Sequence, residues 1–566
     1  MAWYDEAVFY HIYPLGLCGA EKQNSYSAVK HRLNEIECWI EHIEKIGCNA
    51  LYIGPLFESV GHGYETTDYK KLDSRLGTND DLKAFVRRCH GKGIKVIFDG
   101  VFNHTGRDFF AFKDIKLSRE NSRYKDWYCN VNFWGNNEYN DGFSYDNWGG
   151  YNLLAKLNQR NDEVKNYICD VIRFWVSEFD VDGIRLDAAD VLDFDFMKAL
   201  RNTANQVKPD FWLMGEVIHG DYIRWVNEDT LHSVTNYHLH KALYSGHNDH
   251  NYFEIAHTVK RLYDMGNGKM LLYNFTDNHD VERIYTKLNN KAHFAPVHIL
   301  EYTLPGIPSI YYGSEFGIEG RKERGSDDSL RPHLNLNDYK DSYDINPCTK
   351  LISALGRIRQ NTKALSYGDY SQLLLTNRQY AFSRSYNGES VIIAVNNDDS
   401  DYVMTLPCSD CSEYIGLLTG KKVSVSNRSI CVNIAANSGD IFVPSEKAEN
   451  SFNVIIQEKE EKTAQVECAV ENISENIIEA EAAFEEKPSE NAIPKEINEV
   501  ENLKTATESI TSAAIDEAFE KGRIAGLQEA ILAIMERNGY VTDQMRRDVY
   551  NQTHIPSLIT WVKSFR

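Results

Sequence analysis

Short apolar runs alternate with helical patterns over residues 1–365, and this alternation limits the fold of the chain more than any other feature. Helical patterns such as residues 80–90 and 163–178 lie between the apolar runs. Alternating β and α segments predict a parallel α/β fold, and eight strands predict a (β/α)8 TIM barrel. The eight runs are residues 8–15, 50–56, 94–101, 183–188, 211–217, 233–237, 271–275 and 309–312.

One connection in this pattern is much longer than a loop. Residues 104–158 are rich in Asn, Asp, Tyr, Trp and Gly and show little periodicity. A connection of that length inside a compact domain is usually a functional unit of its own. We therefore expect an inserted domain over residues 104–158, at the carboxyl-terminal face of the barrel where barrel enzymes place their active sites.

The sequence pattern changes after the barrel. Residues 366–445 contain short alternating strands, such as residues 380–385 and 391–395, separated by turn residues. This pattern predicts an antiparallel β-sandwich. Residues 446–509 are rich in Glu, Asn and Ala with few aromatic residues, which is typical of a flexible acidic linker.

The last segment, residues 510–566, again has the periodicity of an ordered structure. Four apolar side chains recur at helical spacing: Ile524, Leu527, Ile531 and Ile534. We expect a small helical module, which cannot bury much apolar surface alone. It either forms a homo-oligomer or docks onto a partner, or it is a passive appendage.

The charge balance limits the partners of the protein. The chain has 61 Lys and Arg against 83 Asp and Glu, a formal net charge of −22. Nucleic acid requires a basic surface and anionic membranes repel an acidic one, so we expect neither as a partner. A small neutral substrate fits this charge.

Cysteine usage and the N-terminus together predict a cytoplasmic protein. The 11 cysteines are odd in number and scattered, as expected of reduced thiols. The first residues lack a secretory signal, and no apolar run is long enough to span a bilayer. Cys408 and Cys411 have the spacing of a metal-binding pair, but no second pair accompanies them, so no metal site is predicted.

Polar clusters stand where four of the predicted strands end, and barrel enzymes carry their catalytic groups at such ends. Singly, each has an ordinary explanation, because an Asp at a strand end is often a cap and a Glu is often a solvated charge. Together and in order they favour an active site. The clusters are Asp99–His104, Gly183–Ala188, Gly215–Val217 and Phe275–Asp280.

Two of these carboxyl groups suit the hydrolysis of a glycosidic bond, which requires one carboxylate and one carboxylic acid. Asp187 lies two residues after Arg185, whose guanidinium would keep it ionised as a nucleophile. Glu216 has apolar neighbours in sequence, which would raise its pKa and retain the proton of an acid. Those neighbours are Met214, Val217 and Ile218.

With these clusters identified, residues 1–445 resemble the α-amylase family of (β/α)8-barrel glycoside hydrolases, nearest to its intracellular maltodextrin-acting and neopullulanase-like members. The resemblance implies that Asp187 is the nucleophile, Glu216 the acid/base and Asp280 the third carboxylate, which stabilises the transition state. It also implies that residues 104–158 are the family's domain B and residues 366–445 its domain C.

The same resemblance implies a set of substrate-binding residues. The first Tyr of Gly61–Tyr69 would stack under the sugar, and two histidines would hydrogen-bond its hydroxyl groups. The remaining members come from the blocks around the three carboxylates. The set is Tyr64, Asp99, His104, Arg185, Asn278 and His279.

The function implied is a retaining hydrolase that cleaves α-1,4-glucosidic bonds of maltodextrins or related α-glucans by double displacement. Ala188 follows the nucleophile, where neopullulanase-like and α-1,6-acting members usually have Val, so α-1,4 specificity is expected. Transglycosylation on the same substrates is an alternative with the same catalytic residues. A catalytically silent glucan-binding scaffold is another, although such members usually lose a carboxylate.

Cofactor requirements follow from the same resemblance. Double displacement needs no cofactor. Many members bind a structural calcium through the Asn of the third-strand block, here Asn103, although intracellular members often lack it. No further calcium ligand is identified in the sequence.

Overall fold

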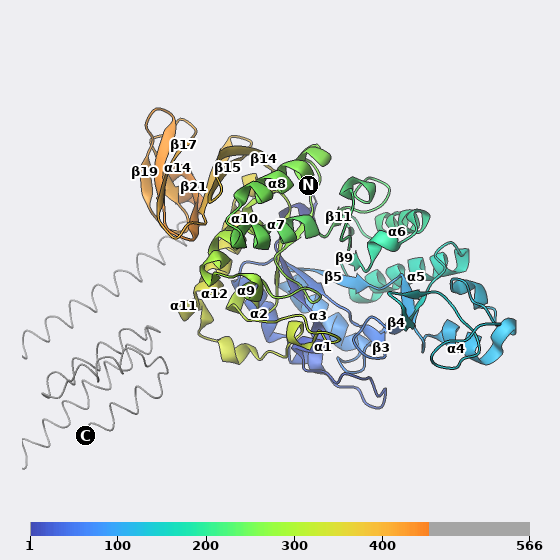
Figure 1. Ribbon diagram of the computed structural model, residues 1–566. Coiled ribbons are helices and arrows are strands. Elements are labelled where there is room, and N and C mark those ends of the chain that lie inside the picture. The colour runs from blue at the N-terminus through green and yellow to red at the C-terminus, as the bar shows by residue number, and fades with distance from the viewer. Residues whose placement is uncertain (1, 452–566) are drawn as a thin grey trace, which may run out of the picture. The chain divides into compact units, whose positions relative to one another are not determined.

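The structure of the protein is a computed structural model that describes residues 2–451 (Figure 1). The predicted helical module, residues 510–566, and the predicted linker from residue 452 onward lie outside the described residues. Within the described part, no helix is both long and apolar enough to cross a membrane.

Eight parallel strands form one sheet, in the order β11-β10-β9-β5-β2-β1-β13-β12. A parallel bridge between Thr235, which follows β11, and Tyr273 in β12 closes this sheet into a barrel. The predicted TIM barrel is therefore confirmed. The strands are β1 (Phe9–Ile12), β2 (Ala50–Ile53), β5 (Lys95–Gly100), β9 (Gly183–Leu186), β10 (Trp212–Gly215), β11 (Ser233–Val234), β12 (Tyr273–Phe275) and β13 (Ile307–Tyr311).

Side chains alternate between the inside of the barrel and the helices around it, as the period of two in a strand requires. In β10, Trp212 and Met214 join the apolar cluster that fills the barrel, whereas Leu213 packs under the helices. The barrel is thus a packed core, and the chemistry is confined to its rim.

Amphipathic helices surround the barrel (Figure 1). In α3 (Asn79–Gly91), the hydroxyl of Thr78 and the carboxylate of Asp81 cap each other's backbone N–H groups, which fixes the first turn. The other helices of the barrel are α1 (Pro14–Leu17), α2 (Cys38–Lys45), α5 (Asp162–Phe179), α6 (Phe194–Val207), α7 (Tyr237–Asn248), α8 (Tyr252–Met265), α9 (Ile284–Lys287), α10 (Phe294–Thr303), α11 (Ser342–Ile345), α12 (Pro347–Asn361) and α13 (Lys363–Tyr367).

The segment between β5 and β9 forms a small unit of its own, light blue in Figure 1. It contains β6 (His104–Gly106), α4 (Phe110–Ser118), β7 (Asn147–Trp148) and β8 (Tyr151–Lys156), and its sheet has the order β6-β8-β7. His104 pairs with Lys156, so the two ends of the inserted segment lie side by side. A hairpin, β3 (Phe57–Ser59) with β4 (Thr66–Leu72), precedes it.

After the barrel, a six-stranded antiparallel sheet faces a two-stranded one across a shared apolar cluster, which agrees with the predicted sandwich. Arg384 anchors it to the barrel by donating to the carbonyl of Thr303 at 2.8 Å. A helix, α14 (Ser445–Ser451), extends into the predicted linker. The strands are β14 (Asp369–Leu375), β15 (Gln379–Tyr386), β16 (Glu389–Asn396), β17 (Tyr402–Pro407), β18 (Glu413–Gly416), β19 (Lys422–Ser424), β20 (Ser429–Ile434) and β21 (Ser438–Pro444).

Candidate active site

The predicted carboxylates lie at the carboxyl ends of neighbouring barrel strands. Asp187 and Glu216 each follow a strand by one residue, β9 and β10, and their backbone N–H groups continue the parallel ladder. Asp187 N donates to Gly100 O at 3.1 Å, and Glu216 N donates to Leu186 O at 2.9 Å. These bonds fix the two Cα positions, so adjacent strands bring the two side chains to one place on the rim.

One guanidinium joins the carboxylates. Arg185, buried in β9, places Nη1 2.8 Å from Asp99 Oδ1 and 2.9 Å from Asp187 Oδ1. Its Nη2 lies 3.0 Å from Glu216 Oε2. A planar fork with several N–H donors can hold three carboxylates at once, which a Lys ammonium could not do in this geometry.

The second carboxylate oxygen of Asp99, Oδ2, is also hydrogen-bonded. The hydroxyls of Tyr52 and Tyr64 donate to Asp99 Oδ2 at 2.9 and 3.1 Å. Gly54 leaves the space for this carboxylate, because a Cβ at residue 54 would lie 2.3 Å from the Cβ of Asp99. Asp99 therefore orients Arg185 and Tyr64 from below the rim.

The prediction that Glu216 lies in an apolar setting is wrong. Its Oε2 also accepts a hydrogen bond from Ala188 N at 3.2 Å, and its Oε1 accepts one from the hydroxyl of Tyr237 at 3.3 Å. Of its neighbours in sequence, Val217 is buried while Ile218 is exposed on the surface. Successive side chains of an extended segment point in opposite directions, so apolar neighbours along the chain do not surround the carboxylate.

The expectation for the charge of Asp187 also needs correction. Arg185 contacts Asp187 as predicted and lowers its pKa, but burial has the larger effect and raises the pKa well above its usual value. Glu216, Asp99 and Asp280 add to the rise. Burial and the neighbouring carboxylates therefore favour the protonated form of Asp187 in the free site.

The opposite balance holds at Asp280, in the loop after β12. Burial would raise its pKa, but His279, Arg331 and Arg185 outweigh burial and keep the pKa well below its usual value. His279 Nε2 lies 3.0 Å from Asp280 Oδ2, and Arg331 Nη2 lies 2.8 Å from Oδ1. These contacts therefore favour the ionised form of Asp280.

Aromatic rings hold His279 in place. Its ring is nearly parallel to those of Tyr13 and Tyr64, with ring centroids 5.8 and 5.7 Å away and interplanar angles of 18° and 11°. The hydroxyl of Tyr64 also contacts His279 Nε2. Tyr64 thus connects Asp99 on one side of the site with His279 on the other.

Two of the predicted binding residues have contacts that are mainly structural. Asn278 Oδ1 accepts from the backbone N–H groups of Asp280 at 2.8 Å and Val281 at 3.1 Å, which shapes the turn that carries Asp280. The Nε2 of His104 lies 3.2 Å from Tyr64 O, and burial lowers the pKa of His104 to about 3. His104 is therefore a neutral ring that supports the Tyr64 backbone, and its contact with sugar stays a prediction.

Sequence reasoning missed three side chains that complete the site: Tyr52, Tyr237 and Arg331. Tyr52 is the third residue of β2 and points inward, so strand periodicity could have found it. Tyr237 follows β11, the shortest strand of the barrel, and begins α7. Arg331 lies 51 residues after Asp280 in the chain and belongs to no strand end, so no local pattern points to it.

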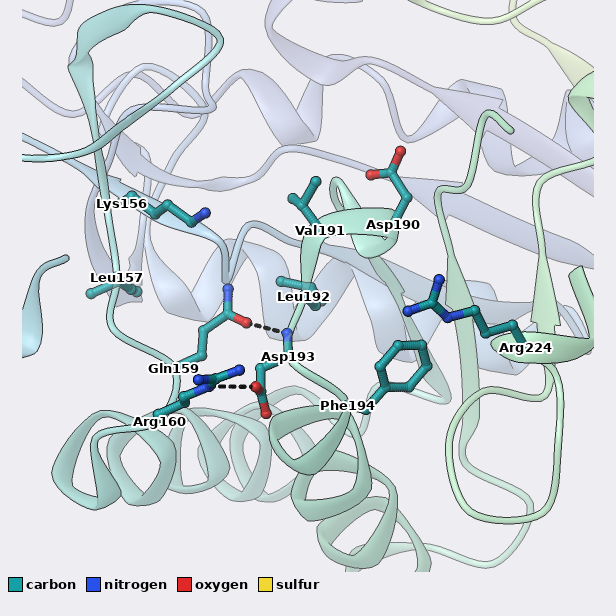
Figure 2. Close-up of a pocket in the computed structure, with 10 residues that line it drawn as sticks. All are labelled: Lys156, Leu157, Gln159, Arg160, Asp190, Val191, Leu192, Asp193, Phe194 and Arg224. Atoms are coloured by element: carbon teal, nitrogen blue, oxygen red, sulfur yellow. Dashed lines mark hydrogen bonds and ion pairs between the residues drawn. The ribbon is translucent and has the colours of Figure 1, made fainter. Parts of the chain in front are cut away.

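A pocket of about 380 Å³ opens on the β9 and β10 side of the site (Figure 2). Arg160 pairs with Asp193 at 3.0 Å, whereas Lys156 and Arg224 extend toward the pocket from opposite sides (Figure 2). Burial and the carboxylate of Glu216 raise the pKa of Asp190, one of the residues that line the pocket. Leu157, Gln159, Val191, Leu192 and Phe194 complete the lining.

The side chain of Asn103 is hydrogen-bonded within the protein. Its Oδ1 accepts a hydrogen bond from Gln159 Nε2 at 3.3 Å, and its Nδ2 contacts His104 Nδ1 at the same distance. Among residues 2–451, no three His, Cys, Asp or Glu side chains are grouped to hold a metal ion. Metal binding stays a prediction, and cleavage of the glycosidic bond by the carboxylates does not depend on it.

Comparison with known proteins gives two family matches. Residues 32–363 match the model of the alpha amylase catalytic domain, and residues 368–442 match that of the alpha-amylase C-terminal domain. The first match covers more than half of the chain.

Individual relatives agree with these matches. A cyclomaltodextrinase of Thermoanaerobacter pseudethanolicus is 32% identical over 428 residues, 71% of this chain and 72% of the relative. An intracellular maltogenic amylase of Bacillus subtilis is 29% identical over 365 residues, 63% of this chain and 60% of the relative. A solved cyclomaltodextrinase structure superposes with a TM-score of 0.69 at 26% identity, over 78% of each chain.

Proposed function

The chain belongs to the α-amylase family and is a glycoside hydrolase of α-glucans, and we propose on this footing that it cleaves α-1,4-glucosidic bonds of maltodextrins with retention of configuration. A single observation carries this proposal. Arg185 contacts both Asp187 and Glu216, so a nucleophile and an acid are held on one guanidinium at the ends of adjacent strands. A retaining mechanism requires such a close pair of carboxyl groups.

In the first step, Asp187 attacks the anomeric carbon while Glu216 gives its proton to the leaving glycosidic oxygen. The bond between Asp187 and the sugar forms as the glycosidic bond breaks, and the electron pair of that bond goes to the protonated oxygen. This step requires that Asp187 is ionised and that Glu216 carries the proton when attack begins. Arg185, which touches both groups, stabilises the anionic form of either one.

In the second step, Glu216 acts as a base. It takes a proton from water, the water oxygen attacks the anomeric carbon, and Asp187 leaves as a carboxylate. Asp280 remains ionised throughout, since His279 and Arg331 hold its charge, and it stabilises the positive charge that develops on the sugar.

Incubation with maltoheptaose, followed by product analysis, tests this proposal. We expect shorter maltooligosaccharides from the parent protein and none from Asp187→Asn. The matched control is Asp170→Asn, which changes an exposed carboxylate on α5 and should leave the products unchanged. Full activity of Asp187→Asn would rule out the proposed nucleophile.

The linkage preference is tested separately. Ala188 after the nucleophile supports α-1,4 specificity, so maltotriose should be cleaved faster than isomaltose or pullulan. Faster cleavage of an α-1,6 linkage would contradict this preference while leaving the assignment of Asp187 intact.

The pocket, lined in part by residues that follow β9 and β10, supports transglycosylation as a second activity. Because Glu216 protonates the leaving oxygen, the departing sugar lies on its side of the cleft, and an acceptor sugar would bind in the same place. The pocket of about 380 Å³ lies in the size range of small-molecule sites. Products longer than maltoheptaose at high substrate concentration would support this activity, whereas products that are all shorter would argue against it.

We further propose that the protein acts in the cytoplasm on oligosaccharides. The name of the Bacillus subtilis relative and the scattered cysteines of this chain support that location. Fractionation of cells with an antibody against the protein tests it, and recovery from the culture medium would count against it.

A further inference from the structure

Arg331 does not lie at the end of a barrel strand, yet its side chain directly contacts Asp280, the third carboxylate. Its Nη2 lies 2.8 Å from Asp280 Oδ1, and its Nε donates to the backbone carbonyl of His279 at 3.0 Å. The same side chain therefore binds both the carboxylate of Asp280 and the backbone carbonyl of the preceding residue, His279. Two contacts to one turn fix orientation as well as charge.

Arg331 is itself held rigidly. Its guanidinium also contacts Asp327 at 3.1 Å and lies over the ring of Tyr13, 4.7 Å from the centroid, and only 13% of its side chain is exposed. The backbone beside it is fixed as well, because Arg283 and Tyr311 both donate to the carbonyl of Leu330. A side chain with so little freedom can orient its partner.

No other Arg or Lys of the described residues shares this position. Lys322 Nζ donates to the backbone carbonyl of Asp280 at 2.9 Å and not to the carboxylate. Arg185 forms its ion pairs with Asp99, Asp187 and Glu216. On its other oxygen Asp280 meets His279 Nε2, so its carboxylate lies between one ring and one guanidinium.

We propose that Arg331 is a positioning residue, which clamps Asp280 against His279 so that the carboxylate faces the sugar as positive charge develops. The inference rests on the proposed function, in which Asp280 stabilises the transition state. An interaction that strengthens only in the transition state acts on kcat and leaves KM nearly unchanged. Loss of the clamp should therefore lower kcat, and this separates positioning from direct binding of the sugar.

The experiment measures kcat and KM on maltoheptaose for Arg331→Gln and Arg331→Lys. We expect Arg331→Gln to lower kcat about 10- to 100-fold, the cost of a misplaced catalytic group, with KM changed less than about twofold. Arg331→Lys should recover part of the loss, because it restores the charge without the fork. Arg321→Gln, an exposed arginine in the same loop, is the matched control and should match the parent.

A double-mutant cycle distinguishes this inference from the proposed function. The activities of the parent, of Arg331→Gln, of Asp280→Asn and of the double variant are measured on an aryl α-maltooligosaccharide whose leaving group needs no protonation. If Asp280→Asn retains full activity, the role of Asp280 itself is wrong. If Asp280→Asn lowers kcat, Arg331→Gln should add less than about a twofold further loss in that background, because Arg331 acts through Asp280.

Three results would overturn the positioning role. One is an equal loss from Arg331→Gln with and without the Asp280 carboxylate. Another is a raised KM with kcat unchanged, which would make Arg331 a sugar contact. The third is parent-like kinetics of Arg331→Gln. If Arg331→Gln does not fold, the same comparisons are made with Arg331→Lys.

Discussion

Arg185 Nη2 lies 3.0 Å from Glu216 Oε2, so the proposed acid/base is bound by the same guanidinium that binds the proposed nucleophile. Both carboxylates thus depend on one buried side chain. Their relative position follows from its contacts.

Replacing Arg185 by Lys should lower kcat by about 100- to 1000-fold, the usual cost of losing a preorganised donor. A Lys ammonium keeps the positive charge but cannot span Asp187 and Glu216 together. Steady-state kinetics on maltoheptaose measure the loss, and thermal unfolding shows whether the fold is retained. The control is Arg173→Lys at an exposed arginine on α5. A parent-like kcat of Arg185→Lys would show that the bridging contact is not needed.

Removing the charge of Asp99 should move the acid side of the pH profile to lower pH. The negative charge of Asp99 raises the pKa of Asp187. In Asp99→Asn, Asp187 therefore loses its proton at a lower pH, and the pH below which kcat/KM falls decreases. The dependence of kcat/KM on pH reports ionisation in the free enzyme and is the quantity to measure.

The same measurement on Asp170→Asn, far from the cleft on α5, should give the parent profile. The overall activity of Asp99→Asn will also be lower, because Asp99 orients Arg185 and Tyr64. A shift of the acid side to higher pH would contradict the charge balance inferred for Asp187.

Acid should destabilise the protein through histidines that are buried and neutral. Burial lowers the pKa of His247 in α7 to about 3, and its Nδ1 lies 2.6 Å from the carbonyl of Leu243. In the unfolded chain a His takes up its proton near pH 6.5. Between pH 6.5 and about 3 the unfolded state therefore binds more protons, so the free energy of unfolding falls as the pH falls.

The variant His247→Gln removes this contribution. Denaturant unfolding at pH 7 and pH 5 should show a smaller loss of stability on acidification than in the parent. His257→Gln, an exposed histidine on the neighbouring helix α8, should retain the parental pH dependence. An unchanged difference between the two pH values in His247→Gln would remove His247 from the explanation.

The predicted module at residues 510–566 leads to a prediction about mass in solution. If it mediates self-association, light scattering should give more than a monomer for the full chain and a monomer for a chain ending at Ser451, the last residue of α14. Maltoheptaose cleavage by the shorter chain serves as the control for folding. Identical monomeric masses would argue against self-association.

The barrel could be predicted from sequence because its strands are apolar runs that alternate with helical patterns, and each predicted run contains an observed strand or overlaps one. Asp187 and Glu216 could be found because each directly follows a barrel strand. Their surroundings were harder to predict. The setting of Glu216 depends on Tyr237 and Ala188, which reach it across space, and the state of Asp280 depends on Arg331, far along the chain.

The pairing of His104 with Lys156 has a consequence for how such an enzyme can diversify. Because the two ends of the inserted segment pair with each other, the segment is attached to the barrel at one fixed place. Its length and sequence can change without altering the spacing of β5 and β9, which carry Asp99 and Arg185. Because Lys156 and Leu157, at the end of this segment, line the pocket, a change in the segment would alter which sugars the pocket admits and leave the catalytic carboxylates in place.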